Sequence, residues 1–477
     1  MSRTKIIATL GPSLDDPQLL RAAIAAGIDV VRLNFSHGTI EDHARRLGQA
    51  REIAEELGRP LGSFGDLQGP KIRLGLVPDE GVLLSDGAEV VLVSGAEQLD
   101  TYEQDGTPLL PVVYEHLAQD VEQGAMVLLD DGMLRLVVVA VDGDRVVTRV
   151  VAGGLVRSRK GVNLPGVEVS AASLTDKDRD DVSDMVELGV NWIALSFVRR
   201  PDDVLQLRAH IEQLGGDQPI IAKLERPEAI EHLAEIVAAS DAVMVARGDL
   251  GVEIGPERVP TIQKRMIDLC NQRGRPVITA TEMLQSMMMS PRPTRAEASD
   301  VANAVFDGTD AVMLSGETAA GRFPVEAVRT MTRIVDEAEA AAEQSRTVAP
   351  TTGSVFGRVM AKAATQVAED VGAVAVLVFT VSGASVVRVS KHRPVQPLLA
   401  LTTSERTLQR LPLLWGTIGT LVEATDQAEQ LIESADRVCT EQRIGQPGDP
   451  IVIVAGRPGG RGGTNRVIVH RLGEPVR

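Results

Sequence analysis

The segments PIIAKLE (residues 219–225) and AVMVARGDLG (residues 242–251) decide the fold, because each is a short apolar run that ends in charged side chains. Six further runs have the same length and character: KIIATLG (5–11), DVVRLNF (29–35), LGSFGDL (61–67), WIALSFV (192–198), PVITATE (276–282) and AVMLSGE (311–317). Between most of these runs, apolar residues recur at three- and four-residue spacing. This periodicity predicts helices at 17–26, 40–57, 201–214, 257–273 and 324–343.

Strands that alternate with helices indicate parallel β structure, and eight such units predict a (β/α)8 TIM barrel. In that fold, catalytic groups lie where the strands end and lead into the helices. Polar side chains occur at these ends: Arg32, Asn34, Ser36, Asp66, Lys223, Glu225, Asp249 and Thr281. A doubly wound open sheet with scattered polar strand ends is the alternative architecture.

Two other regions depart from the barrel pattern. Residues 74–165 contain short Val-rich strands and Gly or Asp turns, which predict an inserted all-β domain, a small β-barrel. This insertion leaves the active-site end of the barrel and can act as a lid, with residues 158–166 as its return hinge. Strand-like runs at 373–380, 395–402, 415–422 and 449–456 predict a C-terminal α/β domain over 345–477, which leaves 1–73 and 166–344 for the barrel.

The composition is typical of a large enzyme without membrane spans. With 477 residues and 44% apolar residues, the chain is too long for a single core. No apolar stretch reaches the roughly 18 to 20 residues that span a bilayer, and the N-terminus has no signal-peptide pattern, so a cytoplasmic location is expected. The net charge of -17 argues against a nucleic-acid partner, and Cys270 and Cys439 form no disulfide framework or catalytic motif.

Lys223 and Glu225 lie two residues apart on one strand, so both side chains point into the barrel. Asp249 follows Gly248 at the next strand end, where a second carboxylate can join Glu225 around a hard cation such as Mg²⁺. The glycines that flank Asp249 leave backbone N–H groups for an anion. A buried ion pair between Lys223 and a carboxylate is the structural alternative.

The motifs TKIIATLGPS (4–13), VRLNFSHG (31–38), GPKIR (69–73), IIAKLE (220–225) and VARGDLGVEI (245–254) occur in order, followed by the long segment from Thr281 to Pro324. In this series the chain resembles pyruvate kinases over nearly its whole length. The resemblance implies transfer of the phosphoryl group of phosphoenolpyruvate to ADP, with Mg²⁺ or Mn²⁺ as cofactor. It also implies a homotetramer.

The resemblance also implies roles for individual residues. Lys223 and Arg32 would contact the phosphoryl group, Glu225 and Asp249 would hold the divalent ion, and Gly248 with Asp249 would bind the substrate carboxylate. Thr281 would lie on the side from which the enolate receives its proton, through a water relay because a hydroxyl is a weak acid. The positions implied for the nucleotide are Asn34, His37, Arg73 and Arg200. His37 can instead be a loop-stabilising residue, and Arg200 stands where many members have lysine.

Lys71 departs from the pattern of the family. Many pyruvate kinases bind K⁺ through groups that match Asn34, Ser36, Asp66 and the backbone of Leu67, and these members usually have glutamate in place of Lys71. An ammonium at this position can supply the positive charge from within the protein, so we expect activity without K⁺. An exposed loop lysine is the alternative.

A second site is expected in the C-terminal domain. Thr380, Ser382, Gly383 and Ser385 lie between a strand and a helix, and Arg457 and Arg461 lie on a glycine-rich loop. Together they suit a phosphorylated effector such as a sugar phosphate or AMP. A plain strand-to-helix turn beside a flexible loop is the alternative.

Two other functions are open from the sequence. A barrel lyase or aldolase would use Lys223 as a Schiff-base amine. A catalytically silent protein would sense sugar phosphates through the C-terminal domain.

Two further pairs of residues are expected to have structural roles. Ser315 with Glu317 is interpreted as a structural strand end, and Thr294 with Glu297 as a helix capping box.

Overall fold

The computed structural model describes residues 2–342, 355–425, 427–456 and 464–475. Eight parallel strands form a closed barrel in the order β1-β17-β16-β15-β14-β13-β3-β2. The strands are β1 (Lys5–Thr9), β2 (Val30–Asn34), β3 (Gly62–Asp66), β13 (Trp192–Leu195), β14 (Ile220–Leu224), β15 (Ala242–Ala246), β16 (Val277–Ala280) and β17 (Ala311–Leu314). The predicted (β/α)8 barrel is therefore confirmed, and the open-sheet alternative is wrong.

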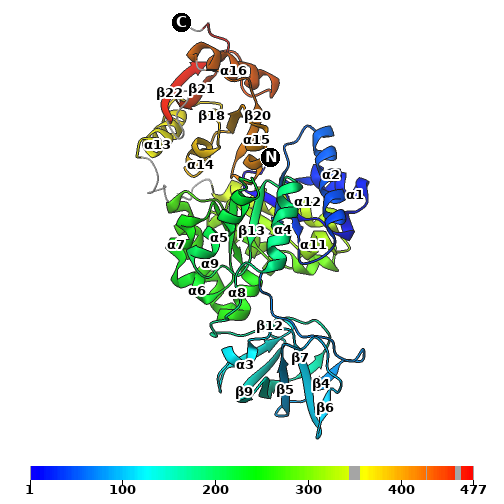
Figure 1. Cartoon of the computed structure of the whole chain (residues 1–477). Coiled ribbons are helices and arrows are strands. Elements are labelled where there is room, and N and C mark those ends of the chain that lie inside the picture. The colour runs from blue at the N-terminus through cyan, green and yellow to red at the C-terminus, as the bar shows by residue number, and fades with distance from the viewer. Residues whose placement is uncertain (1, 343–354, 426, 457–463, 476–477) are drawn as a thin grey trace.

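Helices surround the barrel on its outside (Figure 1). They are α1 (Pro17–Ala26), α2 (Ile40–Glu56), α4 (Asp176–Glu187), α5 (Pro201–Gln213), α6 (Pro227–Glu231), α7 (Leu233–Ala239), α8 (Arg247–Ile254), α9 (Val259–Arg273), α10 (Arg295–Phe306), α11 (Gly316–Ala319) and α12 (Pro324–Ala342). Their starts follow from local chemistry. The Thr294 hydroxyl accepts the N–H of Glu297, whose carboxylate accepts the N–H of Thr294, so the predicted capping box is confirmed.

The two faces of each barrel strand pack into different cores. Ile7, Val30, Phe64 and Ile221 belong to a fully buried cluster, to which the strands contribute alternate residues. The intervening residues pack against the helices in a larger cluster. Since side chains alternate along a strand, Lys223 lies on the same face of β14 as Ile221.

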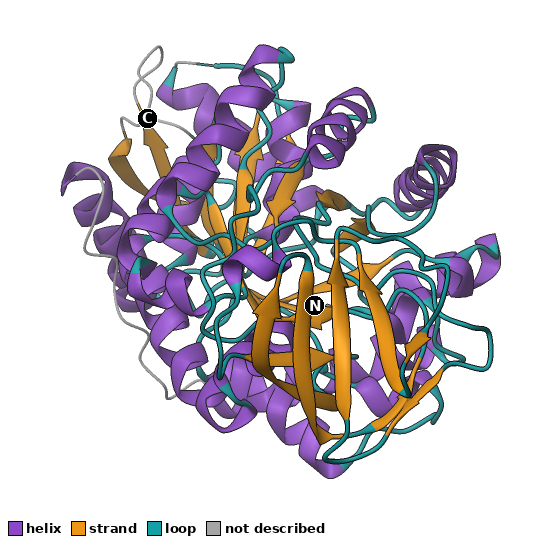
Figure 2. Ribbon diagram, turned by 60° about the horizontal axis from the view of Figure 1, so that its bottom comes forward, coloured by secondary structure: helices purple, strands orange, loops and turns teal. Residues whose placement is uncertain are grey.

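The inserted all-β region follows β3 and is connected to α4 (Figure 1). It contains β4 (Val82–Leu84), β5 (Glu89–Ser94), β6 (Glu103–Gln104), β7 (Thr107–Val112), α3 (Leu117–Asp120), β8 (Met126–Leu129), β9 (Leu134–Asp142), β10 (Arg145–Ala152), β11 (Gly154–Val156) and β12 (Val162–Asn163). Seven strands form one sheet in the order β12-β8-β9-β10-β5-β7-β6, and β4 pairs with β11. Residues 73 and 74 add single β-bridges to Gly161, beside β12, and to Val112 on β7. Figure 2 brings this sheet to the front.

The C-terminal α/β region lies at the opposite end of the barrel from the insertion (Figure 1). Its elements are α13 (Val355–Asp370), β18 (Val376–Thr380), α14 (Ala384–Ser390), β19 (Leu398–Thr402), α15 (Glu405–Arg410), β20 (Thr417–Leu421), α16 (Ala428–Glu441), β21 (Pro450–Gly456) and β22 (Thr464–Arg471). The four predicted strands are present. The antiparallel edge strand β22 was not predicted, and it completes the sheet order β20-β19-β18-β21-β22.

Buried ionic contacts join the barrel to the C-terminal region. Lys391 and Arg393, which follow α14, lie 2.5 and 3.0 Å from the carboxylate oxygens of Asp310 at the start of β17. Cys270 and Cys439 are both buried free thiols on helices, as the sequence suggested. Within the described ranges, we find no helix with the length and apolar character needed to cross a membrane.

Candidate active site

Lys223 is the centre of a cluster at the carboxyl ends of the barrel strands. Its Nζ lies 2.9 Å from Oε1 of Glu225 and 3.2 Å from Oδ1 of Asp66, and it donates a 2.5 Å hydrogen bond to Oγ of Ser196. The side chains of Glu225 and Asp66 are each only 1% exposed. Lys223 therefore forms the buried ion pair that was the structural alternative. Its ammonium also lies at the strand end, where a catalytic group was expected.

The neighbouring carboxylates keep Lys223 charged. Burial alone would lower the pKa of Lys223, but Asp66 and Glu225 raise it above its ordinary value. A Schiff-base enzyme requires a neutral amine, so this environment argues against the lyase alternative.

Arg32 on β2 is held by the same buried acid. Its Nε donates to Oδ2 of Asp66 at 2.7 Å, and its Nη1 donates to the Thr9 hydroxyl at 3.1 Å. Burial would raise the pKa of Asp66, but Lys223 and Arg32 outweigh it and lower the pKa below the ordinary value. Asp66 therefore stays ionised and holds the two cations close together.

Glu225 and Asp249 form the candidate site for a divalent ion. Oε2 of Glu225 accepts the backbone N–H of Phe197 at 2.8 Å. Phe197 has a φ of 54°. Burial raises the pKa of Glu225, Lys223 opposes this rise, and the negative charge of Asp249 adds to it. A bound cation would relieve the repulsion between the carboxylates, so these residues fit a hard metal ion. No group of three or more His, Cys, Asp or Glu side chains suited to a metal occurs among the described residues.

Lys71 lies against the candidate metal ligand. Its Nζ is 3.4 Å from Oδ1 of Asp249, and both side chains are 27% exposed. The groups expected to hold a monovalent cation have other partners. Oδ1 of Asn34 accepts the N–H of Ser36 at 3.3 Å, and the Leu67 carbonyl accepts the Ser196 hydroxyl at 2.7 Å.

Thr281 joins the ends of β15 and β16. Its hydroxyl accepts the N–H of Gly248 at 2.7 Å and lies 2.7 Å from the carbonyl of Ala280, to which it can donate. The N–H of Gly248, expected to face an anion, is therefore engaged by Thr281. Thr281 adopts a φ of 68°, a region that β-branched residues rarely occupy and that is often found at functional sites.

The predicted nucleotide contacts divide into two groups. Partial burial and the charges of Arg73, Arg32 and Lys71 lower the pKa of His37, so these cations lie around one imidazole. Arg73 also donates to the carbonyl of Arg159 at 3.3 Å. Arg200, by contrast, pairs at 2.8 Å with Glu168, and its side chain is 59% exposed. Its partner Glu168 lies just after the return hinge, and Arg200 forms no ion pair with the carboxylates of the Lys223 cluster among the described residues.

Two residues with direct contacts to the site were missed by sequence reasoning. Ser196 directly follows β13 and accepts from Lys223, so its place at a strand end was an available signal. Arg247 donates to the carbonyl of Thr281 at 2.7 Å and pairs with Asp300 at 2.7 Å. Its position directly before Gly248 was a second, weaker signal.

Ser315 and Glu317 have the structural role that the sequence suggested. The carboxylate of the fully buried Glu317 accepts the N–H of Leu284 at 3.0 Å and that of Ser315 at 2.8 Å. Both acceptor oxygens are thus used within the fold.

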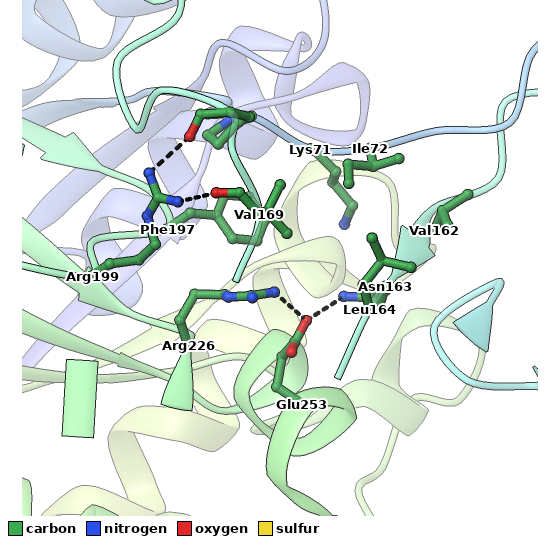
Figure 3. Close-up of a pocket in the computed structure, with 12 residues that line it drawn as sticks. Lys71, Ile72, Val162, Asn163, Leu164, Val169, Phe197, Arg199, Arg226 and Glu253 are labelled. Carbon is green, nitrogen blue, oxygen red and sulfur yellow. Dashed lines mark hydrogen bonds and ion pairs between the residues drawn. The ribbon is translucent and has the colours of Figure 1, made fainter. Parts of the chain in front are cut away.

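The insertion meets the barrel around a small cavity of about 30 Å³, shown in Figure 3. Here the buried Glu253 accepts from Arg226 at 2.9 Å and from Asn163, on the return segment, at 3.2 Å. Lys71 extends toward the middle of the same ring of side chains (Figure 3). The return segment is therefore tied to α8, the helix that carries Asp249.

A larger cleft of about 520 Å³ lies between the insertion and the barrel. Asp131 and Arg135 line it from the insertion, and Arg247, Gly248 and Glu282 line it from the barrel. The cleft reaches Gly248, whose N–H bonds to the Thr281 hydroxyl, so a molecule bound in it would lie between the insertion and this strand end.

In the C-terminal region, the Thr380 hydroxyl accepts the N–H of Gly383 at 2.9 Å, and Ser385 bonds to Thr464 at 2.6 Å. Ser382 is exposed. The two predicted effector arginines, Arg457 and Arg461, lie outside the described residues.

Comparisons with known proteins place the chain in one family. The family described as "Pyruvate kinase, barrel domain" matches residues 1–328, and "Pyruvate kinase, alpha/beta domain" matches residues 358–470. A pyruvate kinase of Mycobacterium tuberculosis is 45% identical over 476 residues, which cover 99% of each chain. Those of Mycobacterium intracellulare and Agrobacterium vitis are 44% and 42% identical, and the alignments cover 99% of this chain and 99% and 98% of theirs.

Proposed function

The chain belongs to the pyruvate kinase family of phosphotransferases, and we propose that it transfers the phosphoryl group of phosphoenolpyruvate to ADP, giving ATP and pyruvate. The observation that carries this proposal is the convergence of Lys223, Arg32, Glu225 and Asp249 at the strand ends. Two cations beside two carboxylates suit a reaction between two anions, in which charge must be neutralised.

Mg²⁺, or Mn²⁺, held by Glu225 and Asp249 would act as a Lewis acid toward the phosphate and carboxylate oxygens of the substrate. The ammonium of Lys223 stabilises charge on the oxygens of the moving phosphoryl group, and Arg32 holds the same group from β2. As the bond from phosphorus to the enol oxygen breaks, a bond to a terminal oxygen of ADP forms. The positions of His37 and Arg73 suit the phosphates of the nucleotide.

The enolate left behind gains a proton at its methylene carbon and becomes pyruvate. Thr281 orients the water that delivers this proton, because its hydroxyl lies at the strand end and is held by Gly248. The insertion closes over the cleft and excludes water, which prevents hydrolysis of the phosphoryl group.

Independence from K⁺ is part of the proposal. The ammonium of Lys71, 3.4 Å from Asp249, supplies a positive charge where other family members recruit a cation. Arg32 and Lys223 occupy the carboxylate of Asp66, which leaves little negative charge to attract K⁺.

The C-terminal region is proposed to bind a phosphorylated activator, a sugar phosphate or AMP, at Thr380, Ser382, Gly383 and Ser385. The exposed apolar side chains of Val355, Phe356 and Val359 on α13 support assembly into a homotetramer. We also propose a cytoplasmic location. The proposed domain limits are those expected from the sequence: 1–73 with 166–344 for the barrel, 74–165 for the insertion and 345–477 for the C-terminal domain.

Turnover of phosphoenolpyruvate tests the assignment. Pyruvate formation should require both ADP and Mg²⁺ and should yield one ATP for each pyruvate. Formation of pyruvate without ADP, or trapping of a carbonyl substrate on Lys223 by borohydride, would contradict it.

A further inference from the structure

Arg226 directly follows Glu225, one of the two proposed metal ligands, and directly precedes α6. The residue before a proline is restricted to extended backbone, and Arg226, which precedes Pro227, has a φ of -118° and a ψ of 149°. Its side chain is 8% exposed. The turn therefore holds a buried guanidinium at a defined place beside Glu225.

The guanidinium of Arg226 reaches α8, the helix that carries the other proposed metal ligand. Its Nη1 donates to Oε1 of Glu253 at 2.9 Å, and the Glu253 side chain is only 1% exposed (Figure 3). Asp249 lies in the first turn of α8, and Glu253 follows it after about one further helical turn. One buried ion pair therefore links the turn after Glu225 to the helix of Asp249.

The same guanidinium also holds the chain that returns from the insertion. Its Nη2 donates to the carbonyl of Val167 at 2.9 Å, and Asn163 donates to Oε1 of Glu253 at 3.2 Å. A guanidinium can donate in two directions at once because its N–H groups form a rigid, planar fork. Arg226 therefore joins the end of β14, α8 and the returning chain.

The charge of Arg226 is directed away from the proposed metal ligands. Its carboxylate partners are Glu253 at 2.9 Å and Glu228 at 3.3 Å. The two oxygens of Glu225 contact Lys223 and the backbone N–H of Phe197 instead. A cation beside a metal site repels the metal ion, so charge alone gives Arg226 no favourable effect on metal binding. Its contacts suit a role in geometry.

We propose that Arg226 is a positioning residue that fixes the placement of Glu225 relative to Asp249, so that both carboxylates can hold one divalent ion. This inference rests on the metal site of the proposed function and deepens it. Arg226 acts on Asp249 through Glu253 and α8, and it does not contact the ion itself. Groups that orient metal ligands in this way typically change metal affinity by about 10- to 100-fold.

Binding of Mn²⁺ to the full-length protein, without substrate or nucleotide, tests this role. Electron paramagnetic resonance of free Mn²⁺ gives the Kd, and loss of binding in Glu225→Gln identifies the site. Arg226→Gln should raise the Kd of this site by about tenfold or more. Removal of a nearby positive charge would by itself lower the Kd. Positioning and charge therefore predict changes of opposite sign.

Arg226→Lys tests the proposal even if Arg226→Gln does not fold, because it keeps a positive charge opposite Glu253. It lacks the planar fork, so its Kd should lie between those of the wild type and Arg226→Gln. Arg208→Gln is the matched control. It removes a partly buried ion pair of 2.8 Å with Asp241, which precedes β15 and lies at the other end of that strand from Asp249. Its Kd should stay within about twofold of the wild type, because distant sites act independently.

The outcomes separate this inference from the proposed reaction. A Kd for Arg226→Gln and Arg226→Lys at or below that of the wild type would overturn the positioning role, and so would an equal rise in Arg208→Gln. Mn²⁺ binding that is insensitive to Glu225→Gln would overturn it together with the metal site. If Arg226→Gln weakened Mn²⁺ binding but the wild type formed no pyruvate, the proposed function would be wrong and the positioning role would stand.

Discussion

The ammonium of Lys71 lies 3.4 Å from the carboxylate of Asp249, one of the two proposed metal ligands. Lys71 lies in the segment that leads from the barrel into the insertion. Lys71 directly precedes the buried Ile72, which belongs to the core of the insertion, and Asp249 lies in the first turn of α8. The contact therefore depends on how the insertion leaves the barrel.

This relationship predicts how the enzyme responds to K⁺. The wild type should form pyruvate at equal rates in K⁺ and in a bulky organic cation. Lys71→Glu places a carboxylate beside Asp249 and removes the internal charge, so its rate should rise with K⁺. Lys71→Gln separates loss of the cation from gain of the anion. A rate of Lys71→Glu that is indifferent to K⁺ would show that Lys71 does not replace the ion.

Thr281 is expected to act on the proton rather than on the phosphoryl group. Thr281→Val should slow exchange of the pyruvate methyl hydrogens with D₂O by about 10² or more, as measured by NMR, because the hydroxyl that orients water is lost. Thr281→Ser keeps the hydroxyl and should retain most of the exchange. If Thr281→Val lowered the rates of phosphoryl transfer and of exchange by the same factor, the proposed specific role of Thr281 in proton delivery would be wrong.

The buried Glu253 predicts a dependence of stability on pH. Burial raises the pKa of this carboxyl above its ordinary value of 4.5, while Arg226 and Asn163 oppose the rise. The folded protein therefore binds this proton more tightly than the unfolded chain. The resulting stabilisation is complete below the ordinary pKa and is lost as the pH rises through the raised pKa.

Glu253→Gln removes this titration. Between about pH 4.5 and pH 7, its urea midpoint should fall less, or rise more, than that of the wild type. Glu257→Gln, at an exposed position in the short 3-10 turn after α8, should keep the pH profile of the wild type. Identical profiles for Glu253→Gln and the wild type would contradict the raised pKa.

The apolar surface of α13 predicts an assembly contact. Phe356 is 80% exposed, and Val355 and Val359 beside it are 62% and 58% exposed. Phe356→Glu should lower the molar mass measured by light scattering, because a charge would be buried at the contact. Leu83→Glu, at a 69% exposed position in the insertion, should leave the mass unchanged. An unchanged mass for Phe356→Glu would exclude this helix from the interface.

Period-two alternation made much of the site predictable. Ile221, Lys223 and Glu225 share one parity, so once the barrel was inferred, both charged groups had to face its interior. The same argument places Arg32 with Val30 and Asp66 with Phe64. The alternation of side chains along each strand was therefore enough to predict that Lys223, Glu225, Arg32 and Asp66 face the barrel interior.

Contacts made by long side chains and by loop backbones were not predictable in this way. Arg200 directly precedes α5, but its flexible side chain pairs with Glu168, which lies 32 residues earlier in the sequence. The N–H of Gly248 is engaged by the Thr281 hydroxyl from a neighbouring strand. Both contacts depend on tertiary neighbours that no local pattern specifies.

The central claim is that the buried ammonium of Lys223 acts in phosphoryl transfer, and its removal tests this most directly. We would measure pyruvate formation from phosphoenolpyruvate and ADP with Mg²⁺ for the wild type, Lys223→Gln and the control Lys264→Gln, whose side chain is 57% exposed. With all three proteins folded by circular dichroism, Lys223→Gln should lose a factor of about 10² to 10³ or more in kcat, and Lys264→Gln should match the wild type. A folded Lys223→Gln variant with the kcat of the wild type would contradict the account.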